Sequence, residues 1–253
     1  MANIQCQFYS ETLGMSTNIQ VMLPQHSALR ASRDGKLPVL YLLHGLGADH
    51  TEWGRHSSIE RLAEEKGIAL VMPSVGRSYY TDMKKGAPYF TYLSEELPAV
   101  ARSLFPLSER REDNFVAGIS MGGYGAFKLG LSFPERYAAA ASLSGGLDIV
   151  SRVNGPNSFL PFEVECIFGN IAELKGSEND LFVLASRLAA SQQQPPHLYQ
   201  CCGTGDFLYQ DNLIFRNHAI AVGLTITYEE EPGEHEWGYW ERKIKRVLDW
   251  LPL

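Results

Sequence analysis

The feature that most constrains this chain is the regular alternation of short apolar runs with amphipathic stretches. Residues 37–43 and 68–72 are nearly continuous apolar runs closed by turn residues, and three further runs share this pattern: 115–118, 138–143 and 198–202. Such runs are typical of central strands in a mostly parallel sheet that helices cover on both faces. The alternation of strands and helices therefore predicts an α/β fold.

The remaining segments complete this prediction. Helices are expected over residues 57–66, 94–105, 122–132, 180–190, 211–222 and 238–251. Ile19, Val21 and Leu23 occupy alternate positions, which predicts antiparallel edge strands before the parallel part. Residues 146–179 are too long for an ordinary connection and are interpreted as a cap-like insertion. A single domain over residues 1–253 is expected.

Composition argues against several classes of function. The chain has 22 Lys and Arg against 29 Asp and Glu, a net charge of −7, which argues against nucleic acid or an anionic membrane as main partner. No apolar run approaches the roughly 18 residues that a spanning helix needs, and the first residues lack a signal-peptide pattern. We expect no membrane insertion and a cytoplasmic location. The four cysteines lack the spacing of a metal or redox motif and are predicted to be buried thiols.

Residues 118–122 read Gly-Ile-Ser-Met-Gly and match the pattern G-x-S-x-G. The apolar run 115–118 leads into the motif, and a helical pattern follows it. A nucleophile elbow requires this order of strand, sharp turn and helix, with small residues on either side that expose the serine hydroxyl. Ser120 is therefore the candidate nucleophile.

A serine hydroxyl needs a histidine to accept its proton and a carboxylate to orient that histidine. Three histidines follow Ser120 in the sequence. His197 opens an expected strand and His218 lies within an expected helix, so both are interpreted as structural. His235 lies in a loop between the strand expected at 224–228 and the last helix, which makes it the candidate base.

Asp206 is the candidate acid because it directly follows the strand expected at 198–202. Asp180 and Asp211 stand at expected helix starts, where aspartate more often caps the helix. The sequence around His235 is rich in carboxylates, interpreted as a solvated acidic rim that disfavours anionic substrates: Glu229, Glu230, Glu231, Glu234 and Glu236.

An oxyanion hole needs two N–H donors. The backbone N–H of Met121, directly after the nucleophile, is the first candidate. The loop after the strand 37–43 supplies the second, where glycines flank Leu46 and let the backbone approach the substrate. His44 is interpreted as a hydrogen-bonding brace of this loop.

These motifs resemble the esterase D family of α/β hydrolases, which includes S-formylglutathione hydrolases and small carboxylesterases, and within it the bacterial tributyrin esterase type. The similar stretches span most of the chain: residues 38–45 with Trp53, 78–82, Tyr92 with 95–98, the Ser120 elbow, 133–134, 143–145, 205–206, and Gly233, His235 and Trp237. The resemblance implies the α/β-hydrolase fold and hydrolysis without a cofactor or metal. It also implies that Trp53, Tyr79 and Tyr80 lie near the acyl pocket.

The expected function is that of a serine carboxylesterase acting on short-chain acyl esters, acetyl to butyryl, of aryl, glyceryl or sugar alcohols. The expected partner is a small-molecule ester; homo-oligomerisation stays open. Transfer of the acyl group to a sugar and hydrolysis of S-formylglutathione remain alternatives. A non-catalytic binding domain is disfavoured because the three triad residues occur in order. Gly123-x-Gly125 resembles a dinucleotide-binding motif, but Lys128 occupies the position of its third glycine.

Overall fold

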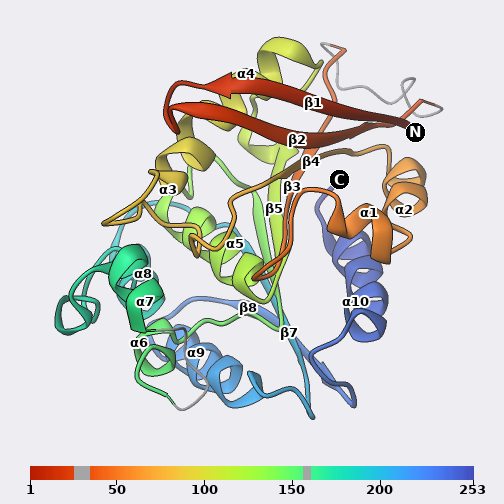
Figure 1. Cartoon of the computed structure of the whole chain (residues 1–253). Coiled ribbons are helices and arrows are strands. Elements are labelled where there is room, and N and C mark those ends of the chain that lie inside the picture. The colour runs from red at the N-terminus through yellow and green to blue at the C-terminus, as the bar shows by residue number, and fades with distance from the viewer. Residues whose placement is uncertain (26–34, 156–160) are drawn as a thin grey trace.

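One eight-stranded sheet runs through the computed structural model, which describes residues 1–25, 35–155 and 161–253 (Figure 1). The strands are β1 (Ala2–Ser10), β2 (Met15–Leu23), β3 (Val39–Leu43), β4 (Ala69–Pro73), β5 (Asn114–Ile119), β6 (Ala139–Leu143), β7 (His197–Gly203) and β8 (Ile226–Glu231). Their order in the sheet is β1-β2-β4-β3-β5-β6-β7-β8. β2 is antiparallel to β1 and β4, and the other pairs are parallel. The predicted parallel sheet with antiparallel N-terminal strands is confirmed.

Helices cover both faces of this sheet. They are α1 (Glu52–His56), α2 (Ile59–Lys66), α3 (Tyr89–Thr91), α4 (Leu97–Leu104), α5 (Met121–Ser132), α6 (Ile149–Arg152), α7 (Pro161–Phe168), α8 (Leu181–Ala190), α9 (Tyr209–Ala221) and α10 (Trp237–Trp250). In β3, Val39 and Tyr41 point into one hydrophobic core while Leu40 and Leu42 point into another, as the alternation of side chains along a strand requires. Helices α2 and α10 pack on the second core; α4, α5, α8 and α9 pack on the first (Figure 1).

Three predicted elements differ from the structure. The helix expected at 57–66 begins only at Ile59, as α2, because Ser57 is extended, with φ −141° and ψ 166°; the separate helix α1 before it was not predicted. The helix expected at 94–105 begins as a π-helical turn, Tyr92–Glu96, before α4. Strand β8 ends at Glu231 rather than at residue 228. Its glutamates stay in the sheet because Lys243 of α10 binds Glu229 and Glu231 at 2.9 and 3.0 Å.

The expected insertion 146–179 contains α6, α7 and a 3₁₀ turn, Ile171–Glu173; residues 156–160 lie outside the described residues. Two backbone N–H groups of the loop after β4, those of Lys84 and Lys85, donate to carbonyls of Ile167 and Cys166 at the end of α7. The side chain of Lys85 also binds Glu165. The segment is therefore attached to the loop that follows β4.

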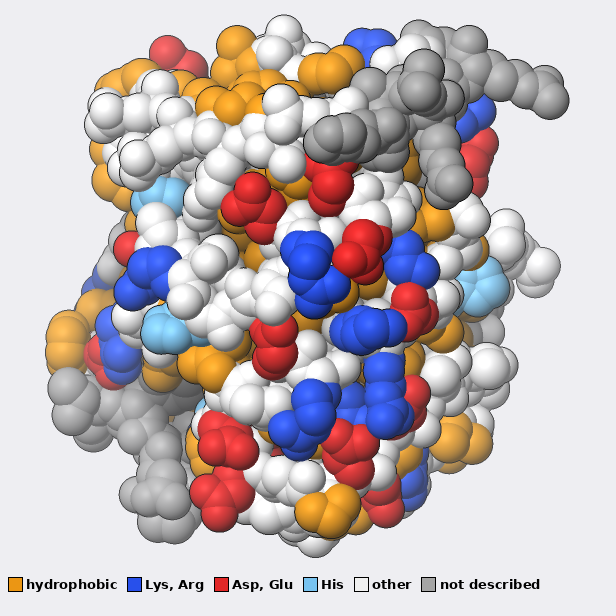
Figure 2. Space-filling model, turned by 90° about the vertical axis from the view of Figure 1, so that its right-hand side faces the viewer, with side chains coloured by type: hydrophobic (Ala, Val, Ile, Leu, Met, Phe, Trp, Pro, Cys, Tyr) orange, Lys and Arg blue, Asp and Glu red, His pale blue; other side chains and the backbone are white. Residues whose placement is uncertain are grey.

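Charged side chains of both signs alternate on the face formed by α2 and α10 (Figure 2). Lys66 and Lys245 both bind Asp249, at 2.8 and 2.9 Å, and Arg61 binds Glu65 at 2.8 Å. Positive and negative side chains on this face are therefore paired, and its described part shows no patch of a single sign. Within the described residues, none of the helices combines the length and the apolar character needed to cross a bilayer.

Candidate active site

Ser120 lies at the sharp turn between β5 and α5. Its φ of 54° and ψ of −118° are a strained conformation for a residue with a side chain. The flanking glycines permit this turn: a Cβ on Gly118 would lie 2.3 Å from the carbonyl oxygen of Gly122, and one on Gly122 would lie 2.5 Å from the carbonyl oxygen of Leu43. The G-x-S-x-G motif is therefore required by backbone contacts on both sides of Ser120.

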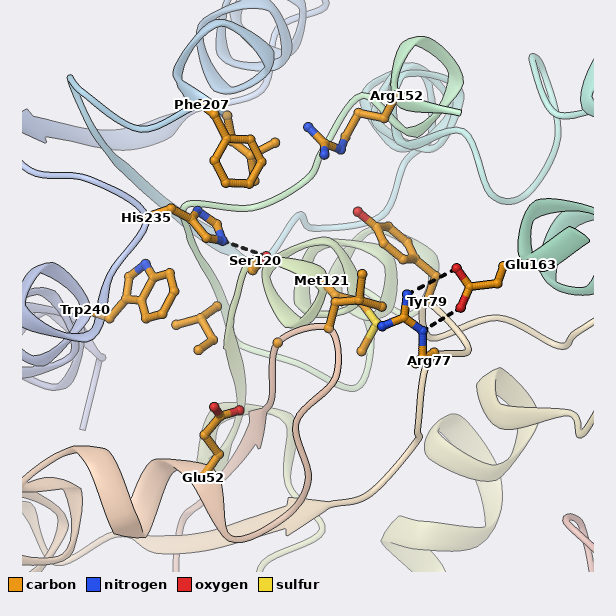
Figure 3. Close-up of a pocket in the computed structure, with 14 residues that line it drawn as sticks. Glu52, Arg77, Tyr79, Ser120, Met121, Arg152, Glu163, Phe207, His235 and Trp240 are labelled. Atoms are coloured by element: carbon orange, nitrogen blue, oxygen red, sulfur yellow. Dashed lines mark hydrogen bonds and ion pairs between the residues drawn. The ribbon is translucent and has the colours of Figure 1, made fainter. Parts of the chain in front are cut away.

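The structure brings the three residues of the predicted triad together. His235 Nε2 lies 2.9 Å from Ser120 Oγ (Figure 3), and His235 Nδ1 lies 2.9 Å from Asp206 Oδ2. Asp206 follows β7 and His235 follows the neighbouring parallel strand β8, so both side chains reach the same edge of the sheet. The two loops are also bonded directly, because the N–H of Gly205 donates to the carbonyl of Gly233 at 2.9 Å.

Hydrogen bonding keeps Asp206 ionised and fixes the tautomer of His235. Burial alone raises the pKa of Asp206, but hydrogen bonds from His235 and from the N–H of Leu208 outweigh it, so the pKa lies below its usual range. The ionised carboxylate can only accept, so Nδ1 of His235 carries the hydrogen and donates. Nε2 of the neutral ring is then free to accept the Ser120 hydroxyl hydrogen.

Two aromatic side chains hold the ring of His235. Phe207, directly after Asp206, packs at 4.6 Å between ring centroids, and Trp240 of α10 packs edge-on at 4.9 Å. The side chain of His235 is 18% exposed, whereas that of Asp206 is fully buried. The base therefore faces the pocket while its carboxylate partner is shielded from water.

The predicted oxyanion donors lie on either side of Ser120. Met121 is the first residue of α5, so its N–H has no acceptor within the helix. Leu46 lies in the loop after β3 and lines the same pocket. His44 holds this loop: its Nε2 accepts from the N–H of Val75 at 3.1 Å, so Nδ1–H donates to the carbonyl of Gly45 at 2.8 Å. Burial lowers the pKa of His44, which keeps the ring neutral for this arrangement.

A cavity of about 430 Å³ opens above Ser120 (Figure 3). Residues from loops and helices at one edge of the sheet line it: Gly45, Leu46, Glu52, Arg77, Tyr79, Ile119, Ser120, Met121, Arg152, Glu163, Phe207, Leu208, His235 and Trp240. Its size lies toward the lower end of the range for small-molecule sites, about 300–1,000 Å³.

Charged residues stand at two sides of this cavity. Arg77 Nε and Nη2 donate to the Glu163 carboxylate at 2.6 and 3.1 Å. Arg152 Nη1 lies 3.4 Å from Asp211 Oδ2, and its guanidinium points toward Phe207, with Cζ 5.4 Å from the ring centroid (Figure 3). Glu52 lies across the cavity, where burial raises its pKa.

Two of the three aromatic residues expected at the pocket do not line it. Trp53 is 1% exposed, and its Nε1–H donates to the carbonyl of Leu43 at 3.0 Å. Successive helix residues point about 100° apart, so Glu52 faces the cavity and Trp53 faces the core. Tyr80 is fully buried, and its hydroxyl donates to the carbonyl of His44 at 2.8 Å. Tyr79 does line the cavity.

The rival triad residues have other partners. His218 bonds to the hydroxyl of Ser186 and the carbonyl of Phe182, and His197 is exposed at the start of β7. Asp180 caps α8, accepting from the N–H of Phe182. Asp211 lies in the first turn of α9 and binds Arg152.

The acidic segment near His235 matches the expected solvated rim only in part: Glu230, Glu234 and Glu236 are exposed, but the other two glutamates are in ion pairs. Glu229 and Glu231 bind Lys243, Arg242 and Arg246 of α10, and hydrogen bonds from Lys243 hold the pKa of Glu231 below its usual range. Cations therefore balance two of the five carboxylates, and at the cavity Arg77 and Arg152 are themselves paired with Glu163 and Asp211.

The cysteines are free thiols, of which Cys201 and Cys202 are buried while Cys6 and Cys166 are partly exposed, so the expectation of burial holds for the vicinal pair alone. Among the described residues, no three His, Cys, Asp or Glu side chains are grouped as a metal would require.

Sequence reasoning missed most of the pocket wall, including Glu52, Arg77, Arg152, Glu163, Phe207, Leu208 and Trp240. Several of them follow strands β4, β6 and β7. The carboxyl ends of parallel strands converge at one edge, so their position after those strands was an available signal. Glu163 had no such signal, since it reaches the cavity from the insertion.

The geometry agrees with comparisons to known proteins. The family Esterase, described as "Putative esterase", matches residues 10–251. An acetyl esterase of Caldicellulosiruptor saccharolyticus is 31% identical over 262 residues, covering 99% of this chain and 98% of the relative.

Two solved structures from Staphylococcus aureus are each 38% identical and cover 99% of this chain and 98% of their own. The fluorophosphonate-binding serine hydrolase FphF, with substrate bound, has a TM-score of 0.91, and the S-formylglutathione hydrolase FrmB has a TM-score of 0.88. The chain belongs to the Esterase family and is a carboxylic ester hydrolase with the α/β-hydrolase fold.

Proposed function

We propose that this protein is a serine carboxylesterase that hydrolyses short-chain acyl esters, acetyl to butyryl, through an acyl-enzyme on Ser120. The observation that carries the proposal is the chain of hydrogen bonds from Ser120 through His235 to the buried Asp206, each 2.9 Å long. This arrangement supplies the nucleophile, base and orienting carboxylate that acyl transfer requires.

In the first half-reaction, Ser120 Oγ attacks the ester carbonyl carbon while His235 Nε2 takes the hydroxyl proton. The N–H groups of Leu46 and Met121 stabilise the negative charge on the carbonyl oxygen. The C–O bond to the alcohol then breaks, and His235 returns the proton to the leaving oxygen. Asp206 stabilises the imidazolium form of His235 throughout.

In the second half-reaction, water attacks the acyl carbon of the ester on Ser120. His235 removes a proton from that water, and the second tetrahedral intermediate forms in the same oxyanion hole. Its collapse releases the carboxylic acid and returns the proton to Ser120 Oγ. No cofactor takes part in these steps.

The segment 146–179 is proposed to act as a cap of the single hydrolase domain. Glu163 of α7 lines the cavity and binds Arg77 through two hydrogen bonds. Such a paired contact fixes both side chains in one geometry. The segment thereby forms one wall of the cavity and limits the acyl or alcohol groups that fit.

S-Formylglutathione is the second candidate substrate. The printed name of FrmB supports this thioester. Its formyl group also fits a short acyl site. The reaction steps at Ser120 are the same, with a thiolate leaving in place of an alkoxide.

Steady-state kinetics on a series of 4-nitrophenyl esters, from acetyl to octanoyl, test the proposal alongside S-formylglutathione and acetylated sugars. We expect kcat/KM to peak within acetyl to butyryl and to fall beyond it. A maximum at longer chains would contradict the short acyl site. A far higher kcat/KM for S-formylglutathione would make the thioester the substrate. Acyl transfer to an added sugar outrunning hydrolysis would identify an acyltransferase.

A further inference from the structure

Lys128 of α5 is a buried cation that the hydrolytic steps do not use. It is 2% exposed and lies eight residues after Ser120 on the helix that begins at the nucleophile. Lysine is almost never fully buried without a partner. Among the described residues, no carboxylate lies within ion-pair distance of Lys128, so its partners are of another kind.

The ammonium group of Lys128 binds two oxygens and lies over the rings of Phe90 and Tyr124. Nζ donates to the backbone carbonyl of Tyr80 at 3.2 Å and to Oδ1 of Asn179 at 2.6 Å. It also lies 4.1 Å from the centroid of the Phe90 ring. Lys128 therefore connects the nucleophile helix to the turn at Tyr80 and to the residue preceding the cap of α8.

The turn that Lys128 binds has an unusual backbone. Tyr79 and Tyr80 have φ values of 53° and 54°, in the left-handed region that aromatic residues rarely adopt. Two consecutive residues in this region persist only where surrounding contacts hold them. The hydroxyl of Ser78 accepts from the N–H of Tyr80, and Lys128 binds the carbonyl of the same residue.

Tyr80 in turn contacts the loop that carries the predicted oxyanion donor. Its ring packs directly on α5, where a Cβ on Gly125 would lie 2.5 Å from Tyr80 Cγ. Its hydroxyl donates to the carbonyl of His44 at 2.8 Å, one residue before Gly45 and two before Leu46. Tyr80 therefore links the nucleophile helix to the loop that carries the predicted oxyanion donor.

We infer that Lys128 is a positioning residue for ester hydrolysis, which fixes the Tyr80 carbonyl so that the Tyr80 hydroxyl holds the loop bearing the Leu46 N–H against Ser120. The inference rests on the proposed roles of Ser120 and Leu46. Gly122, Gly125 and Lys128 recur every three residues along α5 and all face this loop or Tyr80. One side of the nucleophile helix thus sets the distance between nucleophile and oxyanion donor.

This role does not depend on the charge of Lys128. Burial lowers its pKa to about 7, although Asp82 and Glu178 oppose the shift. A neutral amine still has two hydrogens, one for each of the two oxygens. The substitution Lys128→Met therefore removes the donors while it keeps a side chain of similar length in an apolar site.

A double-mutant cycle tests the inference with Lys128→Met, Tyr80→Phe and the double variant on 4-nitrophenyl butyrate. Because a small misplacement of an oxyanion donor weakens binding of the transition state more than of the ester, each single change should lower kcat about tenfold with KM nearly unchanged. Lys128 acts through Tyr80, so the double variant should lose no more than the more damaged single variant.

Tyr124→Phe is the matched control. It lies on the same helix and removes a buried hydrogen bond, 2.7 Å long, to the carbonyl of Asn179. It should lower the melting temperature while kcat stays near the wild-type value. Thermal unfolding of every variant separates lost stability from lost catalysis. If Lys128→Met does not fold, Lys128→Gln replaces it in the cycle; its amide keeps donors on a shorter side chain, so a smaller loss of kcat with the same non-additivity is expected.

A wild-type kcat for Lys128→Met, or losses that multiply in the double variant, would overturn the inference. Ser120→Ala, assayed in parallel, reports on the proposed function separately. Full activity of Ser120→Ala would refute the proposed nucleophile. An inactive Ser120→Ala beside an unimpaired Lys128→Met would refute only the role of Lys128.

Discussion

The Nδ1–H of His235 donates a 2.9 Å hydrogen bond to Asp206, although 29 residues separate the two in sequence. The side chain of Asp206 is fully buried. The bond forms because β7 and β8 are adjacent parallel strands that deliver both residues to one edge of the sheet. It fixes the orientation and the tautomer of the imidazole that faces Ser120. The proposed mechanism depends on this contact.

Replacing Asp206 by Asn should lower kcat by about 10³–10⁴-fold while KM changes little. The amide can donate to Nδ1, which would favour the tautomer with Nε2–H and leave Ser120 without a base. Steady-state kinetics and circular dichroism measure the two effects. Asp180→Asn is the control, since Asn caps α8 equally well and kcat should be unchanged. Near wild-type turnover of Asp206→Asn would assign the acid role to another carboxylate.

Replacing Gly118 by Ala should destabilise the protein by about 1–3 kcal/mol or more, because the new methyl group would lie 2.3 Å from the carbonyl oxygen of Gly122. Urea unfolding measures the change. Gly238→Ala near the start of α10 is the control, since its Cβ would lie 3.6 Å from the nearest atom, Glu236 Oε1. That variant should be as stable as the wild type or slightly more stable. Equal stability of both variants would contradict the tight elbow.

Lys128 should make stability depend on pH. Its pKa is lowered to about 7 by burial, whereas an unfolded lysine titrates near its ordinary value of 10.5. Between these values the unfolded state binds one more proton, so the free energy of unfolding contributed by this residue rises as pH rises. Urea unfolding compares the wild type with Lys128→Met at about pH 6 and about pH 9.5. The free energy of unfolding of the wild type, relative to that of the variant, should be higher at about pH 9.5. A constant difference would mean that Lys128 stays charged.

Replacing Trp53 by Phe should lower stability by about 1–3 kcal/mol, because the Leu43 carbonyl loses its hydrogen bond from Nε1 and the core loses volume. The acyl-chain preference on 4-nitrophenyl esters should stay the same, since Trp53 does not line the cavity. Phe207→Ala, at the pocket beside His235, should raise KM for the same esters. A shifted chain-length profile in Trp53→Phe would place Trp53 at the acyl site after all.

The sheet, the elbow and the residues that the structure brings around Ser120 could be predicted from the sequence, because they depend on the pattern of residues along the chain. Apolar runs specify buried strands, and the G-x-S-x-G pattern specifies a turn whose close contacts admit only glycine. Order along the chain then places Asp206 and His235 after neighbouring strands. None of these inferences needs the position of a distant side chain.

The pocket wall could not be predicted in the same way because it depends on which way single side chains point. Glu52 and Trp53 are neighbours in sequence, yet one faces the cavity and the other faces the core. From the sequence alone, Glu229 and Glu231 look like part of an acidic loop. In the structure both lie in β8, where Lys243 of α10 balances their charge. Glu163 reaches the cavity only through the fold of the insertion.

Labelling with a fluorophosphonate, followed by mass spectrometry of the intact protein and its peptides, tests the central claim most directly. The proposed mechanism predicts one adduct in the wild type, located on Ser120, and none in Ser120→Ala. The adduct should prevent hydrolysis of 4-nitrophenyl butyrate in proportion to labelling. An adduct that persists in Ser120→Ala, or a wild type that hydrolyses the ester without ever being labelled, would contradict it.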